Sequence, residues 1–158
     1  MSSRKDPHRE IERKFLVRSL PKKLRSFPHR EIEQGYLAAS RDGVQVRLRR
    51  SGDKHFITYK RNHGGSRVER EVELTAEQFA ILWPATSGKR LAKTRYDVPL
   101  DRLVVEVDVY RSRHAGLVVA EVEFDDERSA REFVPPNWLG KDVTGVAGYS
   151  NVRLALTS

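Results

Sequence analysis

The sequence contains no cysteine, so disulfide bonds and thiolate metal sites are excluded. It has no apolar run long enough for a membrane-spanning helix, and the opening MSSRKDPHRE lacks the apolar segment of a secretory leader. No low-complexity or Pro/Gly-rich segment divides the chain. We therefore expect one cytoplasmic domain over residues 1–158, in which residues 1–7 form a flexible tail.

Two common types of site are also missing. No Gly-x-x-x-x-Gly-Lys loop occurs, which argues against a P-loop enzyme. The five histidines (His8, His29, His55, His63 and His114) lack the spacing of metal ligands, so we expect them on the surface. Any bound metal must therefore depend on carboxylates.

The charge balance favours an anionic partner. Lys and Arg total 30 against 22 for Asp and Glu, which gives a net charge of +8 and a pI near 10.0. Nucleic acid, an acidic membrane and a polyphosphate all fit that charge. Charged residues make up 33% of the chain against 38% for apolar ones, so charge covers the surface or lines an internal cavity.

Short alternating stretches, several of them separated by turn residues, dominate the chain. They predict a mainly β (α+β) protein built on an eight-stranded antiparallel closed β-barrel, which is wide enough for one small ligand. The expected strands are Arg9–Val17, Ile32–Ala38, Val44–Arg50, His55–Lys60, Arg67–Leu74, Lys89–Val98, Leu103–Tyr110 and Leu117–Phe124.

A few flanking helices are expected between the strands. Thr75 has the features of an N-cap for a helix over residues 76–83, with Phe79 on its apolar face. A second helix is predicted over Glu127–Phe133, ending before two prolines, and a third from residue 151 to the end. Lys22–Ser26 is expected to form a short helical turn.

Charged and apolar residues alternate along most of these strands. In residues 10–17, period two places Glu10, Glu12 and Lys14 on one face and apolar side chains on the other. If the apolar faces pack outward against the helices, the charged faces line the interior, where unpaired charge destabilises the fold unless it binds something. The same pattern places further charged side chains on one face of three other stretches: Arg47, Arg49, Glu106, Asp108, Glu121 and Glu123.

Metal-assisted phosphoryl transfer needs the two kinds of charge found on these faces. The first and last strands of a closed barrel are often neighbours, which would bring two Glu-x-Glu pairs together around a cation. Oxygen ligands select Mg²⁺ or Mn²⁺, while Arg and Lys suit phosphate oxygens. Each pair alone is more typical of a solvated strand face, so the prediction depends on their joint occurrence. The candidate cations are Lys14, Arg47, Arg49, Lys60, Lys93 and Arg95.

Several motifs in order resemble the CYTH superfamily, the triphosphate tunnel metalloenzymes, and its small bacterial branch in particular. Glu10-x-Glu12-x-Lys14 is similar to the N-terminal signature of that family. The resemblance continues over nearly the whole chain, through Gln34-Gly35-Tyr36-Leu37, Arg47-x-Arg49, Lys60, Arg67-x-Glu69-x-Glu71, Lys93-Thr94-Arg95-Tyr96, Glu106-x-Asp108, Glu121-x-Glu123-Phe124, Pro135-Pro136-x-Trp138 and Tyr149-x-Asn151.

The resemblance implies an eight-stranded tunnel that holds a triphosphate with Mg²⁺ or Mn²⁺. It implies metal binding by Glu10, Glu12, Glu121 and Glu123. Phosphate oxygens would be bound by Lys14, Arg47, Arg49, Lys60, Lys93 and Arg95, and the acidic tunnel lining would be Glu69, Glu71, Glu106 and Asp108. Lys93, as a leaving-group donor or charge stabiliser, and Tyr36 are the implied catalytic residues.

The substrate stays open at this point. We expect inorganic tripolyphosphate, which would be hydrolysed to pyrophosphate and phosphate, because the recognisable residues address phosphate and metal. The alternatives are an organic triphosphate, namely thiamine triphosphate or a nucleoside triphosphate, and adenylate cyclisation of the class IV type. Residues Gly145-Val146-Ala147-Gly148 depart from the family, whose small bacterial members commonly carry charges there. That departure weakens the expectation of tripolyphosphate.

Two classes outside enzymes fit the sequence less well. A basic nucleic-acid-binding barrel would use its strand aromatics for stacking, but the paired carboxylates would repel a phosphate backbone. A structural interaction module would leave the clustered carboxylates without a role. We therefore expect a small-molecule triphosphate as the partner, with no membrane and no nucleic acid; the oligomeric state stays open, a homodimer included.

Overall fold

The computed structural model describes residues 11–63 and 66–157. The predicted tail at residues 1–7 and the predicted metal ligand Glu10 lie outside the described residues. The chain forms two compact units, one made of Glu33–Leu91 with Asn151–Ser158 and the other of Ile11–Ile32 with Ala92–Ser150. The prediction of a single domain stays a prediction, and we describe each unit by itself.

The first unit is built on four antiparallel strands. They are β2 (His29–Ala39, whose first four residues belong to the other unit), β3 (Val44–Ser51), β4 (Lys54–His63) and β5 (Ser66–Leu74), hydrogen-bonded in the order β5-β4-β3-β2. Arg47 lies opposite Thr58 across β3 and β4, and Lys60 lies opposite Glu69 across β4 and β5. Residues opposite each other in a ladder share a face, so the predicted charged face runs across three strands.

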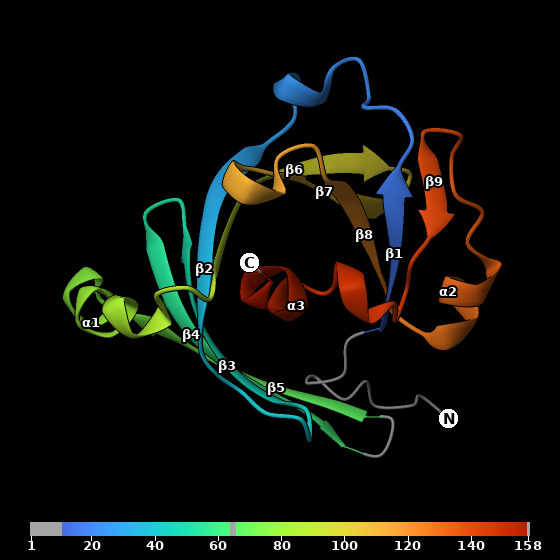
Figure 1. The fold of residues 1–158 in the computed structure, drawn as a ribbon. Coiled ribbons are helices and arrows are strands. Elements are labelled where there is room, and N and C mark those ends of the chain that lie inside the picture. The colour runs from blue at the N-terminus through green and yellow to red at the C-terminus, as the bar shows by residue number, and fades with distance from the viewer. Residues whose placement is uncertain (1–10, 64–65, 158) are drawn as a thin grey trace. The chain divides into compact units, whose positions relative to one another are not determined.

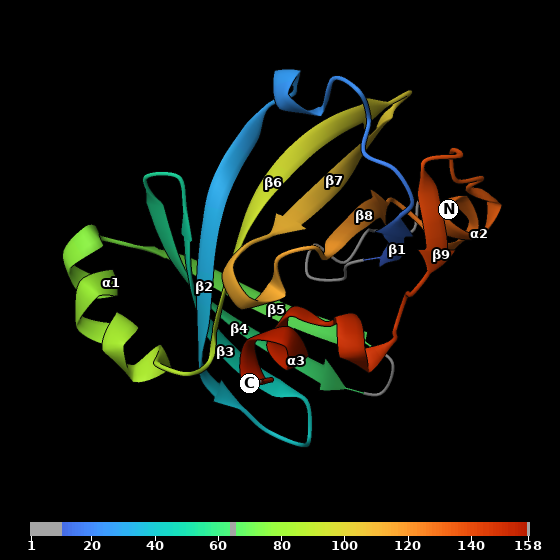
Figure 2. The ribbon, with the colours of Figure 1, turned by 45° about the horizontal axis from the view of Figure 1, so that its top comes forward.

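Helices lie on both faces of this sheet (Figures 1 and 2). Helix α1 (Ala76–Leu82) begins at Thr75 with a capping box, because Gln78 N donates to Thr75 Oγ1 at 3.1 Å and Thr75 N donates to Gln78 Oε1 at 2.9 Å. Buried Phe79 stacks on Trp83, the first residue of the 3₁₀ helix η2 (Trp83–Thr86). On the other face lies α3 (Asn151–Leu156), with Leu154 and Ala155 buried.

Gly35 lets η2 approach β2 closely. A Cβ at this position would lie 2.5 Å from Cβ of Thr86, closer than packed carbon atoms approach. Side chains alternate along β2, so Gln34 and Tyr36 lie on one face. Gly35, between them, faces η2 on the other side.

The second unit contains the remaining strands, hydrogen-bonded in the order β6-β7-β8-β1-β9. They are β6 (Arg90–Leu100, whose first two residues belong to the first unit), β7 (Leu103–Tyr110), β8 (Val118–Phe124), β1 (Ile11–Val17) and β9 (Leu139–Asp142). The unit also holds α2 (Glu127–Glu132) and the 3₁₀ turns η1 (Leu24–Ser26), η3 (Ser112–His114) and η4 (Ala147–Tyr149).

One face of this sheet forms the hydrophobic core of the second unit. The core contains the apolar sides of β1, β6, β7 and β8 together with residues from η1, α2 and β9. Arg13 crosses this face and ties three elements together: Nη1 donates to the carbonyl oxygens of Ala130 and Phe133, and Nε and Nη2 donate to Asp142. The charged side chains of the same strands are thereby left to the opposite face.

The mainly antiparallel β-architecture and the predicted helices are confirmed, with two corrections. The described residues contain nine strands rather than eight, because Leu139–Asp142 pairs with β1. The predicted closure was wrong at the level of hydrogen bonding: among the described strands, β5 pairs only with β4 and β9 only with β1. No helix within residues 11–63 or 66–157 is long and apolar enough to cross a membrane.

Candidate active site

The charged face of the second unit is set by strand register. Glu12 on β1 lies opposite Glu123 on β8, and Lys14 lies opposite Glu121, which in turn lies opposite Glu106 on β7. These positions alternate with the buried core positions of the same strands, as the sequence predicts. The sheet therefore collects the predicted carboxylates and Lys14 on one surface.

A fully buried ion-pair cluster occupies part of this face. Lys93 Nζ donates to Oδ2 of Asp108 at 2.6 Å, and neither residue is exposed to solvent. Arg95 binds the same carboxylate through two donors, Nε to Oδ1 at 2.7 Å and Nη2 to Oδ2 at 2.8 Å. Asp108 thus holds two of the predicted phosphate-binding cations in fixed positions.

Electrostatics keep this carboxylate ionised. Burial by itself would raise the pKa of Asp108, but Lys93 and Arg95 outweigh burial and hold that pKa well below its ordinary value. Burial likewise acts to lower the pKa of Arg95, and the charge of Asp108 more than compensates, so that pKa is raised. Asp108 and Arg95 are therefore both charged at neutral pH.

Lys14 and Glu121 form a second pair on the same face. Lys14 Nζ lies 3.4 Å from Oε1 of Glu121 and also donates to the carbonyl oxygen of Tyr149 at 3.2 Å. Burial acts to raise the pKa of Glu121, but Lys14 and the neighbouring cations outweigh it and lower that pKa. Tyr149 directly follows the Gly145–Gly148 segment that departs from the family pattern, so that segment leads into a contact of Lys14.

Glu106 lines a polar cavity of about 380 Å³ in this unit, together with residues that include Arg30, Asp97 and Glu123. Arg95 Nη1 donates to Glu106 at 3.0 Å, and Arg30 bridges Asp97 and Glu106. Burial is the main reason that the pKa of Glu106 is raised, despite the attraction of Arg95. Sequence reasoning missed Arg30, which lies two residues before the strand expected over Ile32–Ala38.

The first unit carries the other predicted cations. Arg47 Nη2 lies 3.9 Å from Glu69, and Lys60 Nζ lies 3.7 Å from the same carboxylate. Thr58 donates to Glu71 at 2.8 Å. These separations are longer than the 2.6 and 2.7 Å of the ion pairs around Asp108.

Two buried donors in the first unit have no acceptor within the part of the chain that the structure describes. Arg47 is 7% exposed, and its Nε has no hydrogen-bond partner there. The hydroxyl of Tyr36 accepts a bond from Gln34 Nε2 at 3.2 Å, but no described residue accepts its proton. Buried donors normally find acceptors, so both point to a ligand rich in acceptor oxygens.

Gln34 is a further residue that the sequence reasoning did not assign to the site. It is fully buried, and its Oε1 accepts from Nε and Nη2 of Arg49 at 3.1 and 2.9 Å. The signal was present in the motif Gln34-Gly35-Tyr36, where period two places the amide beside the tyrosine.

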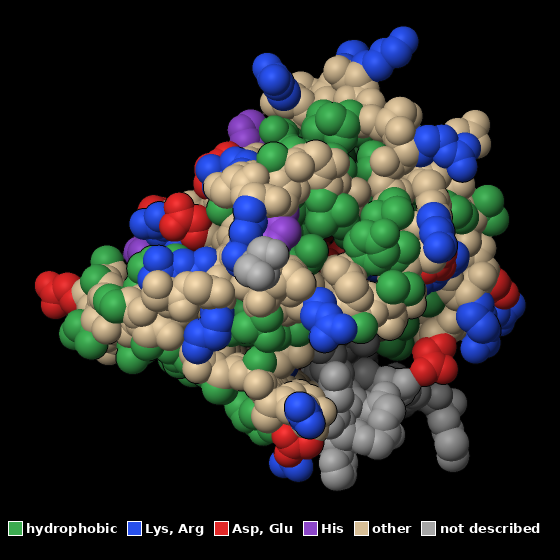
Figure 3. Space-filling model, in the orientation of Figure 1, with side chains coloured by type: hydrophobic (Ala, Val, Ile, Leu, Met, Phe, Trp, Pro, Cys, Tyr) green, Lys and Arg blue, Asp and Glu red, His purple; other side chains and the backbone are tan. Residues whose placement is uncertain are grey.

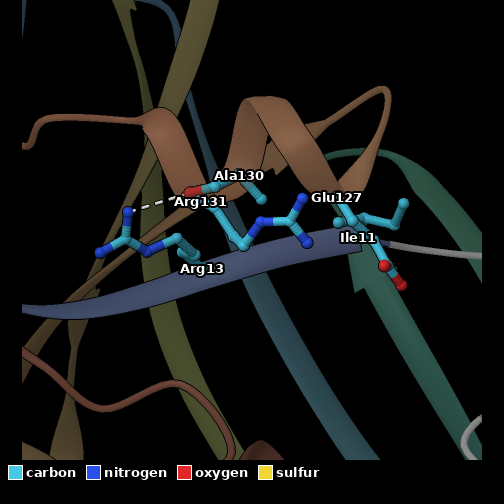
Figure 4. A pocket seen from close by; sticks show the side chains of 5 residues that line it. All are labelled: Ile11, Arg13, Glu127, Ala130 and Arg131. Carbon is cyan, nitrogen blue, oxygen red and sulfur yellow. Dashed lines mark hydrogen bonds between the residues drawn. The ribbon is translucent and has the colours of Figure 1, made fainter.

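A hollow of about 630 Å³ between β1 and α2 contains none of the predicted site residues. Figure 4 shows its lining: Arg13, whose Nη1 reaches the carbonyl of Ala130, with Ile11, Glu127 and Arg131 around it. The view in Figure 3 shows Lys and Arg side chains scattered over the surface rather than gathered in one patch. That scatter agrees with a basic exterior in addition to the cations of the site.

Residues 8–144 match the CYTH domain family, which is most of the chain. The chain belongs to the CYTH domain family. This membership agrees with the resemblance drawn from the sequence motifs. Membership of the CYTH triphosphatases implies a divalent metal cofactor.

Two CYTH relatives are close in sequence. An inorganic triphosphatase from Nitrosomonas europaea is 44% identical over 149 residues, which cover 94% of this chain and 97% of that protein. An inorganic triphosphatase from Acetivibrio thermocellus is 36% identical over 111 residues, covering 69% and 70% of the two chains. A crystal structure of an inorganic triphosphatase, 39% identical, superposes with a TM-score of 0.74 and covers 94% of this chain and 95% of that one.

The carboxylate oxygens of this CYTH chain are the kind of ligand that a hard divalent cation prefers. Glu12 and Glu123 place two like charges directly opposite each other, an arrangement that a cation between them would stabilise. Within residues 11–63 and 66–157, no group of three or more His, Asp or Glu side chains is arranged to hold a metal. Glu10, the remaining member of the first Glu-x-Glu pair, lies outside the described residues.

Proposed function

We propose that this protein hydrolyses inorganic tripolyphosphate to pyrophosphate and phosphate with Mg²⁺ or Mn²⁺. The burial of its cations carries the proposal: Arg47, Lys60, Lys93 and Arg95 are each at least nine-tenths buried. Burying cations is costly, and a polyanionic ligand is a partner that would offset this cost in each unit. The names of the two relatives support the same activity.

The proposed roles follow the chemistry of each side chain. Lys14, Lys93 and Arg95 of the second unit, and Arg47, Arg49 and Lys60 of the first, bind phosphate oxygens. Glu12, Glu121 and Glu123, with Glu10, would hold the metal, which would supply positive charge to neutralise the phosphate oxygens. Asp108, Glu69 and Glu106 keep the cations oriented, and Glu71 acts through Thr58.

Hydrolysis breaks one P–O–P bond, and the oxygen of a water molecule joins the released phosphate. Negative charge develops on the leaving oxygen, where a fixed cation lowers the barrier. Lys93 is the proposed stabiliser of that charge, since Asp108 fixes its side-chain nitrogen with a hydrogen bond of 2.6 Å. Tyr36 is proposed to contact the substrate through its hydroxyl.

The test is phosphate release by the purified protein with Mg²⁺, Mn²⁺ or EDTA. Tripolyphosphate, thiamine triphosphate, ATP and pyrophosphate are compared as substrates. We expect metal-dependent cleavage that favours tripolyphosphate. A preference for thiamine triphosphate or ATP would replace the proposed substrate, and absence of turnover by a folded protein would contradict the enzyme proposal.

A matched pair of variants on β3 tests the binding site. Arg47→Gln removes a buried cation, and we expect kcat/KM to fall by about 10- to 100-fold, as for loss of a charge-assisted hydrogen bond. Arg50→Gln is the control, because Arg50 is exposed and pairs with Glu33 on the surface. Equal effects of the two substitutions would contradict the assignment of Arg47 to the substrate site.

A further inference from the structure

Gln34 connects two predicted site residues of the first unit. Its Oε1 accepts two hydrogen bonds from Arg49, and its Nε2 donates to the hydroxyl of Tyr36 at 3.2 Å. The side chain is fully buried between β2 and β3. A buried amide with both ends engaged has a single allowed orientation.

That orientation decides which way the hydroxyl of Tyr36 donates. A guanidinium group has donors only, so the oxygen of the amide must face Arg49 and the nitrogen must face Tyr36. The hydroxyl is therefore the acceptor in its bond with Gln34, and its own proton points away from the amide. No described residue accepts that proton, although Tyr36 is only 1% exposed.

A bound anion would supply the missing acceptor. Arg47 presents a second buried donor without a partner, Nε, on the same face as Arg49 and two residues away along β3. Phosphate oxygens accept hydrogen bonds from both kinds of group. The same arrangement thus satisfies donors that are otherwise buried at a cost.

We propose that Gln34 is a positioning residue, which holds the guanidinium of Arg49 in place and directs the hydroxyl proton of Tyr36 toward an oxygen of the bound triphosphate. This inference rests on the proposed function, since it needs a triphosphate as the ligand. It makes Tyr36 a hydrogen-bond donor to the substrate and Gln34 the residue that sets this direction.

Gln34→Glu separates the two roles. A carboxylate still accepts from Arg49, but it also accepts from the hydroxyl of Tyr36 and so draws that proton away from the ligand. It further neutralises part of the charge of Arg49. The substitution should therefore weaken triphosphate binding through both residues, whereas in a Tyr36→Phe background it can act through Arg49 alone.

The experiment is a double-mutant cycle on affinity for tripolyphosphate, measured by calorimetry in EDTA so that metal-dependent turnover cannot occur. Gln34→Glu, Tyr36→Phe and the double variant are compared with the wild type. We expect the fold-loss of affinity caused by Gln34→Glu to be about ten times smaller in the Tyr36→Phe background than in the wild type. A factor of about ten corresponds to one hydrogen bond. Equal losses in both backgrounds would overturn the proposal.

Two further variants keep the result interpretable. Gln34→Met repeats the cycle without a buried charge, and it should also lose less in the Tyr36→Phe background. Thr86→Val controls for a general loss of stability. It removes a buried hydroxyl of η2, which packs on the other face of β2, and the affinity for tripolyphosphate should not change. A loss of affinity in Thr86→Val equal to that in Gln34→Met would overturn the positioning role.

The double-mutant cycle and the hydrolysis assay can fail independently of each other. A wild type that binds tripolyphosphate but does not cleave it with metal contradicts the proposed hydrolysis, while the cycle still decides the role of Gln34. A wild type that cleaves tripolyphosphate and shows independent effects contradicts only the role of Gln34. A folded wild type that neither binds nor cleaves it overturns both.

Discussion

Replacing Asp108 by Asn should strongly destabilise the protein. The carboxylate is buried and accepts three charge-assisted hydrogen bonds, one from Lys93 and two from Arg95, at 2.6 to 2.8 Å. An amide of the same shape removes the charge that Lys93 and Arg95 share, and it leaves Arg95 with its longer bond to Glu106 at 3.0 Å. Breaking a buried pair in this way costs about 3–5 kcal/mol of unfolding free energy, a large share of the 5–15 kcal/mol typical of a domain.

Urea unfolding followed by circular dichroism measures this loss. Asp142→Asn is the matched control, because Asp142 also accepts from an arginine, Arg13, but its side chain is 41% exposed. An exposed pair is worth less than about 1 kcal/mol. Similar losses for Asp108→Asn and Asp142→Asn would refute the argument that burial makes the Asp108 cluster costly to break.

The pH dependence of the Asp108 effect has a definite sign. The folded state holds the pKa of Asp108 below its unfolded value of about 3.9, so its contribution is complete above that value and disappears as the pH falls through the lower, folded value. The stability difference between wild type and Asp108→Asn should therefore be constant near pH 7 and shrink below about pH 4. A difference that grows on acidification would contradict the ionised assignment.

Three other substitutions have predictable effects. Gly35→Ala places a methyl group 2.5 Å from Cβ of Thr86 and should cost about 1–3 kcal/mol of unfolding free energy in urea titrations. Thr75→Ala removes the capping box of α1 and should cost about 1 kcal/mol by the same assay. Glu121→Gln removes the partner of Lys14 and a proposed metal ligand, so it should lower kcat/KM by at least about tenfold and raise the metal concentration needed for half-maximal rate.

Matched controls exist for each of these substitutions. Gly148→Ala meets no atom within 4 Å of its new Cβ and should change stability by less than about 0.5 kcal/mol. Ser87→Ala is the control for Thr75→Ala, because Ser87 is exposed and ends η2 through its backbone N–H, which donates to the carbonyl oxygen of Pro84. Glu33→Gln breaks an exposed pair with Arg50 and should leave the metal requirement unchanged, so a shift equal to that of Glu121→Gln would contradict the metal role.

Alternation of charged and apolar residues predicted the faces of the strands correctly. Lys14 opposite Glu121, and Glu106 on the same surface, follow from period two once the strands pair. The pairing register itself requires contacts far apart in sequence, so the sequence could name Asp108 as acidic lining without identifying Lys93 and Arg95 as its partners. Only the folded structure shows which cations contact Asp108.

Two features escaped prediction for different physical reasons. Strand β9 (Leu139–Asp142) is too short to show alternation, and it is a strand because it pairs with β1, more than 120 residues earlier in the chain. Gln34 is uncharged, so a search for charged faces passes over it. Its role depends on both hydrogen-bonded neighbours, which only the three-dimensional arrangement reveals.

The central claim is metal-dependent hydrolysis of tripolyphosphate, and product analysis by ³¹P NMR tests it most directly. With Mg²⁺ or Mn²⁺, we predict that the signals of tripolyphosphate are replaced by those of pyrophosphate and phosphate in equal amounts, and that EDTA abolishes the reaction. Unchanged tripolyphosphate in the presence of folded protein and metal, or equal turnover in EDTA, would contradict the account.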